Sequence, residues 1–452
     1  MKIELHPPLT YTSVAGEPSP SGAPEGASQR KATLETPHTE VCVIGLGAVG
    51  LPLAALFAHA GVSVCGVDLK EDLVHQVERG HCEGAEPGLD QMIHQQRAAR
   101  RLRASTRLPV AQTYILATPT LSLETPDPYA ALGAAIDALL PVLPPGALVV
   151  VESTCAPGSL EGLLLEPLRR TGRAIGRDVF VAHCPERVLP GRALEELAHA
   201  PRVVAGHTQA CAERARALYA RLGAPVHMAS SIDVAQAAKL VENAQREMNI
   251  AFSNHLADWA RAHDLNVRDV IDAANTHPRV DVLRPGVGAG GRCLPLATSL
   301  LTTGPPEQMS LLRATADYHR QLGSELAARA LGAAARPRDL TVALLGASYK
   351  PDVPDTRDSP TAALKRALER DERVACVRVS DPLATSCLWA SLTSLERAID
   401  GADVLICCVA HEAYTHLPDS TLSSLRGAVI ADYCAGLPPH WSRIHHGPWL
   451  HR

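Results

Sequence analysis

The sequence is poor in aromatic residues, and it has neither a long apolar run nor a block of basic residues. Phe, Tyr and Trp make up only 3% of its 452 residues, and the formal net charge is −5. Without a basic patch, neither nucleic acid nor an anionic membrane surface is favoured as a partner. A signal-peptide h-region is also missing, so we expect a cytoplasmic protein without a membrane segment.

The 12 cysteines contain no CxxC pair, so the usual zinc and redox-dithiol patterns are absent and we predict no metal site. Scattered thiols suit a reducing compartment. Five of them lie in expected strands and are predicted to be small core residues: Cys42, Cys65, Cys376, Cys407 and Cys408. Four histidines near the end lie in a Pro-rich stretch and predict a flexible tail, not a metal site: His440, His445, His446 and His451.

The first ordered segment is a β-branched run that begins at Val41 and breaks into glycines before the helical stretch 51–60. This strand, turn and helix, followed by a second strand at 62–68, is typical of a dinucleotide-binding sheet. The turn supplies the predicted pyrophosphate contacts, with N–H groups at the helix start: Gly45, Gly47, Ala48, Val49 and Gly50. Asp68 ends the second strand, where a carboxylate accepts from both ribose hydroxyls, which favours NAD over NADP.

Further predicted strands at 111–118, 147–152 and 179–183 each end in polar residues. Ligands of open parallel sheets bind at the carboxyl ends of the strands. The candidate site residues at these ends are Thr118, Pro119, Thr154, Glu186, Arg187 and Val188.

Residues 233–264 contain neither Pro nor Gly and have apolar residues at helical spacing, which predicts one long helix. Such a helix would connect two α/β halves and pack against a second subunit, and Trp259 is expected to serve that packing. Lys239 and Asn243 are four residues apart and share one helical face. If that face meets a reacting carbon, the two supply a cation and an amide for an oxyanion.

The stretch 284–295 places four glycines within six residues and then Cys293, just before Pro295. Glycines allow close approach of the backbone to a ligand, and Pro295 suits the first turn of a helix. A thiol at a helix start beside Arg292 is expected to have a stabilised thiolate and to be a better nucleophile. The alternative is a glycine-rich turn with an incidental cysteine.

A second α/β unit begins near residue 340, with strands at 341–345, 374–380 and 404–409 and a helix from Thr361. We therefore predict an α/β fold of two Rossmann-like parallel-sheet domains joined by a central helical domain. The expected boundaries are a disordered leader at 1–38, an NAD-binding domain at 39–215, a helical dimerisation domain with the Cys loop at 216–325, a nucleotide-sugar-binding domain at 326–440 and a tail at 441–452.

From about residue 40 to 437 the chain resembles the UDP-glucose and GDP-mannose dehydrogenase family, and most of all its UDP-N-acetyl-D-mannosamine branch. The resemblance is carried by GLGAVGLPLA, ESTCAPGS, CPERVLPGR, AKLVENAQREMNIAFSNHLA, THPRV, PGVGAGGRCLP and SYKPDVPDTRDSP. It implies two NAD-dependent oxidations of a sugar C6 alcohol to a carboxylate, as in polysaccharide biosynthesis, by a homodimer.

The same resemblance implies roles for individual residues. Cys293 matches the nucleophile that forms a thiohemiacetal and then a thioester, and Lys239 and Asn243 match the oxyanion-stabilising pair. Thr154 and Glu186 match residues that position water and the reacting carbon. The implied substrate contacts are Glu186, Arg187, Val188, Lys239, Asn243, Arg279, Gly290 and Lys350, and Arg357 is implied near the cofactor.

The sequence departs from the family pattern beside the nucleophile. Ala297 stands where the family has an Asp that assists proton transfer, and Arg292 stands where acetylhexosamine enzymes usually have His. Three readings therefore remain open. The chain performs both oxidations, it stops at the aldehyde or oxidises another hydroxyl, or it binds nucleotide sugar without catalysis.

Overall fold

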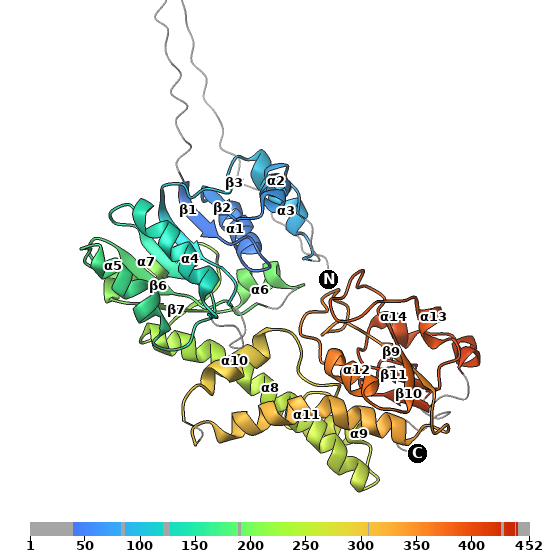
Figure 1. The fold of residues 1–452 in the computed structure, drawn as a ribbon. Helices are drawn as coiled ribbons and strands as arrows, with labels where there is room; N and C mark the ends of the chain where they lie inside the picture. Colours follow the sequence, from blue (N-terminus) through green and yellow to red (C-terminus); the bar gives the residue numbers. More distant parts are fainter. Residues whose placement is uncertain are drawn as a thin grey trace, which may run out of the picture. The chain divides into compact units, whose positions relative to one another are not determined.

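The computed structural model describes residues 39–82, 86–120, 127–188, 191–305, 307–425, 429–438 and 440–441. The predicted leader, and the predicted tail after Trp441, lie outside the described residues. Along the rest of the chain, a large sheet is followed by a helical segment and then by a smaller sheet (Figure 1). The predicted α/β class with two parallel sheets and helices between them is confirmed.

The first part of the chain forms eight strands in the order β3-β2-β1-β4-β5-β6-β7-β8, all paired in parallel except β6 with β7. Its elements are β1 (Thr39–Ile44), α1 (Gly50–His59), β2 (Val64–Val67), α2 (Glu71–Glu78), α3 (Leu89–Ala98), β3 (Leu102–Ser105), β4 (Ala111–Leu116), α4 (Ala130–Leu139), η1 (Leu140–Val142), β5 (Leu148–Val151), η2 (Glu161–Leu165), α5 (Glu166–Arg170), β6 (Phe180–His183), α6 (Ala193–His199), β7 (Arg202–Gly206), α7 (Gln209–Ala220) and β8 (Val226–Met228).

Both faces of this sheet are covered, which explains why its strands are almost continuously apolar. One core lies between the sheet and α1, α3, α6 and α7, and the other lies between the sheet and α4, η2 and α5. In the register of β1 with β4, Cys42 lies beside Tyr114 in the second core, while Val41 faces the first.

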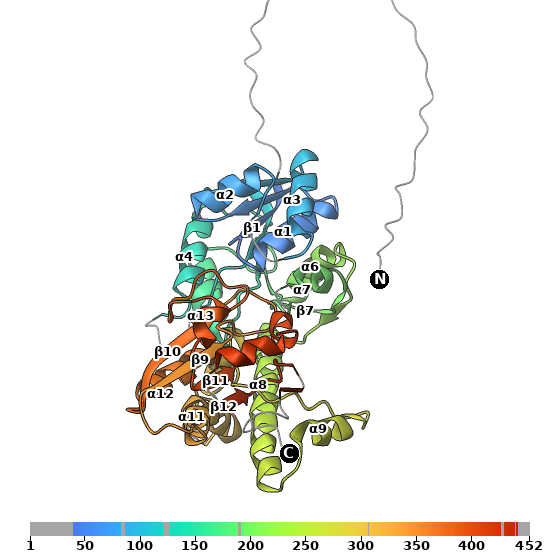
Figure 2. The same ribbon diagram turned by 90° about the vertical axis from the view of Figure 1, so that its right-hand side faces the viewer.

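The middle of the chain is helical, with α8 (Ile232–Ala262), α9 (Val267–Asn275), α10 (Cys293–Leu301) and α11 (Ser310–Gly332). The Ser231 hydroxyl caps α8 by accepting from Val234 N, and the helix runs for 31 residues, as its uninterrupted apolar spacing predicts. Figure 2 shows α8 along its length, with α9 following as a separate short helix. Among the described helices, none is long and apolar enough to cross a membrane.

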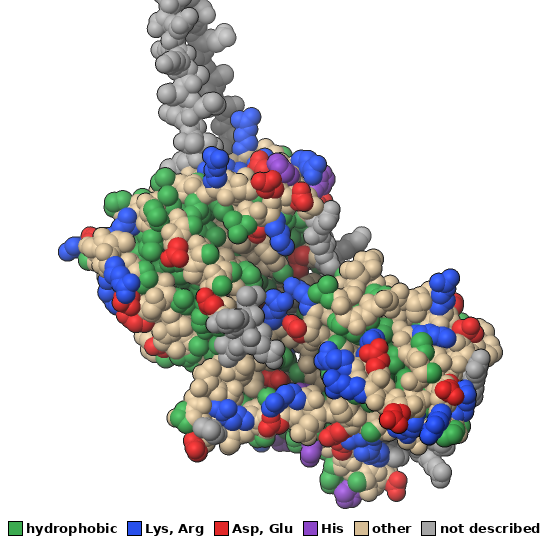
Figure 3. All heavy atoms as spheres, viewed as in Figure 1, with side chains coloured by type: hydrophobic (Ala, Val, Ile, Leu, Met, Phe, Trp, Pro, Cys, Tyr) green, Lys and Arg blue, Asp and Glu red, His purple; other side chains and the backbone are tan. Residues whose placement is uncertain are grey.

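The last part forms a parallel sheet in the order β10-β9-β11-β12. Its elements are β9 (Leu340–Leu345), α12 (Thr361–Glu369), β10 (Val374–Ser380), α13 (Leu395–Ile399), β11 (Val404–Cys407), α14 (Glu412–Thr415), η3 (Asp419–Ser424) and β12 (Val429–Asp432). Helices α11 and α12 cover one of its faces, and α13, α14 and η3 lie at the other. On the face of the molecule in Figure 3, basic and acidic side chains are interspersed.

Two expectations about this region are wrong. Cys376 is exposed, because β10 is an edge strand whose first residues have little cover, whereas Cys42, Cys65, Cys407 and Cys408 are buried as predicted. Trp441, which we assigned to the flexible tail, is only 1% exposed, and its indole N–H donates to Asp419 at 3.0 Å. His440 also approaches Asp419, at 2.5 Å. In the sequence, Trp441 follows two prolines and belongs to no helical or strand pattern, so its burial could not be predicted.

Candidate active site

The strand order of the first sheet gathers the predicted site residues along one edge. Strands β2, β1, β4, β5 and β6 are consecutive neighbours, and all run parallel. Their carboxyl ends therefore lie in a row, and the segments that follow them carry Asp68, Gly45, Thr118, Thr154 and Glu186 in that order. Residues that are more than a hundred positions apart in the chain share one edge for this reason.

The turn after β1 fits a dinucleotide. A Cβ on Gly50 would lie 1.9 Å from the carbonyl oxygen of Gly45, so helix α1 can approach the turn only with glycine there. A Cβ on Gly47 would meet nothing within 4 Å, which leaves open space beside the backbone where a pyrophosphate can approach. Asp68 accepts from Leu46 N at 2.8 Å and from Lys70 N at 3.0 Å, which holds its carboxylate at the turn.

The loops after β4 and β5 are joined by hydroxyl groups that we did not predict. Ser153 Oγ donates to the carbonyl of Thr118 at 2.7 Å, and Thr120 Oγ1 donates to the carbonyl of Thr154 at 2.6 Å. The two bonds fix the backbone of both predicted residues, Thr118 and Thr154. Their sequence signal is a hydroxyl residue within two positions of each predicted one, Thr120 after Thr118 and Ser153 before Thr154.

A buried polar network lies behind this edge. Glu152 is 1% exposed and accepts from Tyr219 Oη at 2.5 Å and from Arg202 Nη1 at 3.2 Å. Burial raises the pKa of Glu152, and the Arg202 charge opposes the rise. Glu186 N donates to the carbonyl of Glu152 at 3.4 Å, so the network supports the loop that carries Glu186. In the sequence, the only indication of this network is that a glutamate, Glu152, ends an apolar strand.

Cys293 is the first residue of α10, as predicted, and its side chain is exposed. Helix α10 packs along α8 through an apolar cluster that contains Leu240, Leu296, Ala297 and Leu300. Asn243 Nδ2 donates to the carbonyl of Cys293 at 3.3 Å, which ties the start of α10 to α8. This packing brings the thiol into the electrostatic range of Lys239.

The surroundings of the thiol differ from our expectation of a stabilised thiolate. Desolvation by the protein raises the pKa of Cys293 above its usual range, and the charge of Lys239 is the largest effect that lowers it. Glu186 raises the pKa of Cys293, and Arg357 and then Arg292 lower it. Arg292, which we expected to help stabilise the thiolate, lies 3.5 Å from Asp358, which partly neutralises its charge.

Lys239 and Glu186 form a nearly buried pair beside the thiol. Lys239 is 6% exposed, and its Nζ lies 3.9 Å from Glu186 Oε2. The other carboxylate oxygen of Glu186 accepts from Val188 N. The distance of 3.9 Å is too long for a hydrogen bond, so the pair is held by charge alone.

Ala297 lies one turn after Cys293 on α10 and is fully buried in the apolar cluster with Leu240. A carboxylate at this position would meet apolar side chains instead of water. Ala297 therefore fits its apolar surroundings. Among the described residues, Glu186 is the carboxylate that pairs with Lys239.

The loop between β9 and α12 lies against the glycine-rich stretch 284–295, which we call the Cys loop. A Cβ on Gly290 would lie 2.6 Å from Pro360 Cδ and 2.9 Å from Tyr349 Cβ, so this glycine is required by packing. Gly291 N donates to the carbonyl of Asp358 at 3.1 Å. The contacts bring Arg357 near the thiol, where it pairs with Asp355.

Lys350, on the same loop, lies among other charged side chains. Desolvation lowers the pKa of Lys350, Glu196 raises it, and Arg192 and Arg246 lower it. The cations around Lys350 therefore come from the first sheet region and from α8. Such a group of cations is suited to binding a pyrophosphate.

Two other predicted residues have different surroundings. Arg187 forms a paired contact with Glu242, at 2.9 and 2.7 Å, and its Nη1 donates to the carbonyl of Pro201. Arg279 is exposed in the segment after α9, 3.4 Å from His277 Nε2, and is not among the charges that act most strongly on Cys293. The structure thus does not bring Arg279 into the group around the thiol.

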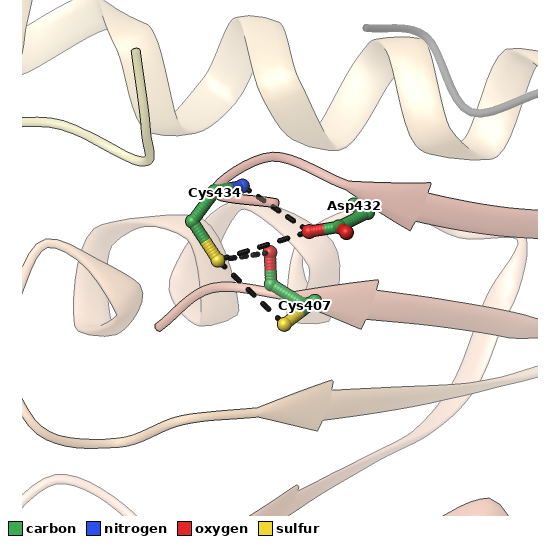
Figure 4. Close-up of side chains that lie close together, drawn as sticks. All are labelled: Cys407, Asp432 and Cys434. Atoms are coloured by element: carbon green, nitrogen blue, oxygen red, sulfur yellow. Dashed lines mark hydrogen bonds between the residues drawn. The ribbon is translucent and has the colours of Figure 1, made fainter. Parts of the chain in front are cut away.

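A separate cluster at the carboxyl end of the second sheet contains Cys407, Asp432 and Cys434 (Figure 4). The two sulfur atoms are 3.6 Å apart. Asp432 already accepts backbone N–H groups from Cys434, Gly436 and Leu437 at 3.0 to 3.3 Å. These bonds use most of the carboxylate's acceptor capacity and explain the turn after β12, so we assign no metal to the cluster.

Three models of known domains match this chain in order. They are the NAD binding domain at 39–223, the central domain at 233–318 and the UDP binding domain at 343–437, all of the UDP-glucose/GDP-mannose dehydrogenase family. The chain belongs to the UDP-glucose/GDP-mannose dehydrogenase family. It is therefore an NAD-dependent nucleotide-sugar dehydrogenase, and the enzyme and cofactor predictions are confirmed.

Relatives of this dehydrogenase align over nearly their full length. A UDP-N-acetyl-D-mannosamine dehydrogenase of Pyrococcus horikoshii is 34% identical over 87% of this chain and 94% of its own. An NDP-N-acetyl-D-galactosaminuronic acid dehydrogenase of Ralstonia nicotianae is 32% identical over 85% and 93%. A solved structure of the Pyrococcus horikoshii UDP-D-ManNAc dehydrogenase superposes with a TM-score of 0.83 at 31% identity and covers 89% of this chain and 96% of its own.

The electrostatics of the thiol give a first prediction. In the Lys239→Met variant, loss of the positive charge should raise the pKa of Cys293 further, so its alkylation by iodoacetamide should need a higher pH than in the wild type. Peptide mass spectrometry at Cys293 measures the rate across a pH series. Arg292→Met serves as the control and should shift the midpoint less, because the effect of Arg292 on the thiol is smaller. An unchanged midpoint in Lys239→Met would show that this charge does not act on the thiol.

Proposed function

We propose that the dehydrogenase oxidises the C6 hydroxyl of a UDP-N-acetylhexosamine, such as UDP-N-acetyl-D-mannosamine, to the uronate through a covalent bond to Cys293. The observation that carries the proposal is an exposed thiol at the start of α10 within range of Lys239 and Glu186. The relatives named for N-acetylated sugars support the substrate class. NAD, when bound, accepts a hydride from C6.

In this mechanism the thiol of Cys293 adds to the C6 aldehyde and forms a thiohemiacetal. Lys239 stabilises the negative charge on the former carbonyl oxygen, and the second N–H of Asn243 is available for the same oxygen. After the second oxidation, C6 is a thioester on Cys293. Glu186 removes a proton from the water that hydrolyses it and then gives this proton to the Cys293 sulfur, which leaves as the thiol. The covalent bond keeps the aldehyde from escaping between the two oxidations.

The other predicted residues complete the proposal. Gly45, Gly47, Ala48, Val49, Gly50, Asp68, Thr118 and Pro119 would hold NAD, with Thr154 between cofactor and substrate. Lys350 would bind the nucleotide sugar, together with Arg187, Val188 and Gly290, and Arg357 would lie by the cofactor. The domain boundaries predicted from the sequence stay part of this proposal. A reducing cytoplasm suits a mechanism that needs the free thiol of Cys293.

The buried Ala297 supports a second candidate, in which the reaction stops at the aldehyde. Without the family's Asp, Glu186 must serve both as the partner of Lys239 and as the group that takes the hydroxyl proton of the thiohemiacetal in the second oxidation. If Glu186 cannot do both, the thiohemiacetal breaks down to the free thiol and the aldehyde, which is released.

One experiment separates the two candidates. Purified enzyme and NAD are incubated with UDP-N-acetylmannosamine, UDP-N-acetylgalactosamine, UDP-glucose and GDP-mannose. We expect turnover with an N-acetylated UDP-sugar, two NADH per sugar by absorbance, and a carboxylate product in the mass spectrum. One NADH per sugar, with no carboxylate, would establish the second candidate, and no turnover with any UDP-sugar would contradict both.

A further variant tests the role of Glu186. Glu186→Gln should slow hydrolysis about 10²-fold or more, because the amide cannot accept the proton of water. The first turnover should still release NADH, and intact-protein mass spectrometry should then find an acyl group on Cys293. Glu213→Gln on α7, which changes the same side chain at the surface, is the matched control. Equal steady-state rates for Glu186→Gln and Glu213→Gln would exclude Glu186 as the base.

We also propose a homodimer through α8. Val234, Val241, Phe252 and Trp259 are between 47% and 56% exposed, although all are apolar. At 100° per residue these positions lie within about 20° of one another, in one stripe about 38 Å long. Asn243, which contacts the Cys293 backbone, lies about 180° around α8 from Val234 at the start of the stripe. A second copy could therefore cover the apolar stripe without covering the thiol. Arg279 would then be free to reach the partner's substrate.

The dimer is tested by a charge in the stripe. Phe252→Glu should give a particle of 48.0 kDa, the mass of one chain, where the wild type gives twice that mass by light scattering. Because Phe252 is exposed, the fold should survive. Leu388→Glu, at a fully exposed leucine outside the stripe, should leave the dimer intact. A wild type of 48.0 kDa would refute the dimer.

A further inference from the structure

The second sheet begins with the same turn as the first. Gly346 follows β9 with a φ of +104°, and Gly45 follows β1 with a φ of +95°. Gly346 N donates to Ser380 O at 2.8 Å, as Gly45 N donates to Val67 O at 2.8 Å. In both cases the next strand in sequence ends in an aspartate, Asp381 after β10 and Asp68 after β2.

The two aspartates also share their nearest contacts. Asp68 Oδ2 accepts from Leu46 N, and Asp381 Oδ2 accepts from Ala347 N, both at 2.8 Å. Asp68 Oδ1 accepts from the N–H two residues later at 3.0 Å, and Asp381 Oδ1 accepts from Leu383 N at the same distance. Asp381 therefore has the place in the second sheet that a ribose-binding aspartate has in a dinucleotide fold.

The acceptor capacity of Asp381 is used up by the protein. Besides Ala347 N and Leu383 N, it accepts from Ser348 N at 2.9 Å, Ser348 Oγ at 3.0 Å and Ala384 N at 2.9 Å. His411 Nε2 lies 3.3 Å from the same carboxylate. Burial alone would raise the pKa of Asp381, but hydrogen bonds from His411 and from these backbone groups hold it well below its usual range. A carboxylate that already accepts from six donors cannot also accept from the hydroxyl groups of a ribose.

His411 connects this aspartate to the loop 347–360. It follows β11 and is fully buried, and its Nδ1 accepts from Asp352 N at 3.1 Å. Because Nδ1 accepts, the neutral ring carries its proton on Nε2 and donates it to Asp381. Glu412 N donates to Asp352 Oδ1 at 3.0 Å, and Asp352 has a φ of +57°, so the bend two residues after Lys350 is held from both directions.

We propose that Asp381 and His411 are positioning residues for the nucleotide sugar. In this second sheet, Asp381 fixes the start of the loop 347–360 by accepting from Ala347 N and Ser348 N. His411 contacts Asp381 and accepts from Asp352 N, so it fixes the bend beside Lys350 relative to Asp381. On its opposite side, the loop 347–360 packs against the Cys loop, where Tyr349 contacts Gly290 and Gly291. The inference depends on the proposed function in one respect, the assignment of Lys350 to the nucleotide sugar.

Two substitutions at His411 separate its two contacts. In His411→Asn the side-chain oxygen can still accept from Asp352 N near the position of Nδ1, but the contact with Asp381 is lost. In His411→Gln the amide can still donate to Asp381, but the acceptor for Asp352 N is lost. If the bond from Asp352 N to His411 is needed for binding, His411→Gln should raise the Kd for UDP, measured by calorimetry, about tenfold. It should also raise KM for the nucleotide sugar about tenfold. His411→Asn should change both by about twofold or less.

Tyr414→Phe is the matched control. Tyr414 is buried, meets the His411 ring edge to face at 5.6 Å, and donates to Ser380 O at 3.1 Å, so the variant loses a buried hydrogen bond of the same domain without touching the loop. It should lower Tm but leave UDP binding and KM unchanged. In all three variants KM for NAD should stay within about twofold, because that site belongs to the first sheet.

The results that would overturn the proposal are specific. Equal loss of UDP affinity in His411→Gln, His411→Asn and Tyr414→Phe, in step with Tm, would mean that His411 only stabilises the domain. Unchanged UDP affinity in His411→Gln would mean that the bend does not need the histidine. UDP affinity is measured without turnover, so a wild type that binds UDP but oxidises no sugar would contradict the proposed reaction and leave this test intact.

Discussion

The packing of α10 against α8 is the contact on which the candidate site depends. An apolar cluster around Leu240 and Ala297 joins the two helices, and the Asn243 amide fixes the carbonyl of Cys293 at the first turn. Lys239 lies one residue before Leu240, so the same packing that buries the leucine brings the lysine to the thiol. Leu240 and Lys239 are neighbours on α8, and Cys293 is on α10. A shift of α10 along α8 would therefore disrupt the apolar cluster and also move the thiol away from Lys239.

The thiol lies in a balance of opposed effects. Desolvation raises the pKa of Cys293, and the charge of Lys239 lowers it without fully reversing the rise. A raised pKa decreases the thiolate fraction, which makes a thiol less reactive toward oxidants. A carboxylate at position 297, one turn after the thiol, would add a negative charge that raises the pKa of the thiol further, and Ala297 adds none. In the proposed mechanism the base chemistry falls to Glu186.

Much of the architecture could be predicted from the sequence, because it rests on local signals. The glycine turn, the strand ends and the uninterrupted spacing of α8 each identify their element without knowledge of the rest. What could not be predicted depends on contacts between distant segments. Arg292, adjacent to the thiol in sequence, was expected to help stabilise the thiolate. Asp358 pairs with Arg292, however, and Lys239, 54 positions before Cys293, has the larger effect. Cys376 was misplaced because strand order, which makes β10 an edge, is not a local property.

The second sheet shows how a fold motif can be kept while its ligand changes. Its glycine turn and strand-end aspartate match those of the NAD-binding sheet, yet Asp381 binds the protein itself and Asp68 keeps acceptor capacity. The central claim, however, concerns the sulfur of Cys293. Its most direct test is rapid quenching of wild-type enzyme during turnover, followed by peptide mass spectrometry of the segment that contains Cys293. We predict a nucleotide-sugar acyl adduct on that sulfur, absent from Cys293→Ser. Turnover to the uronate by Cys293→Ser at the wild-type rate would contradict the account.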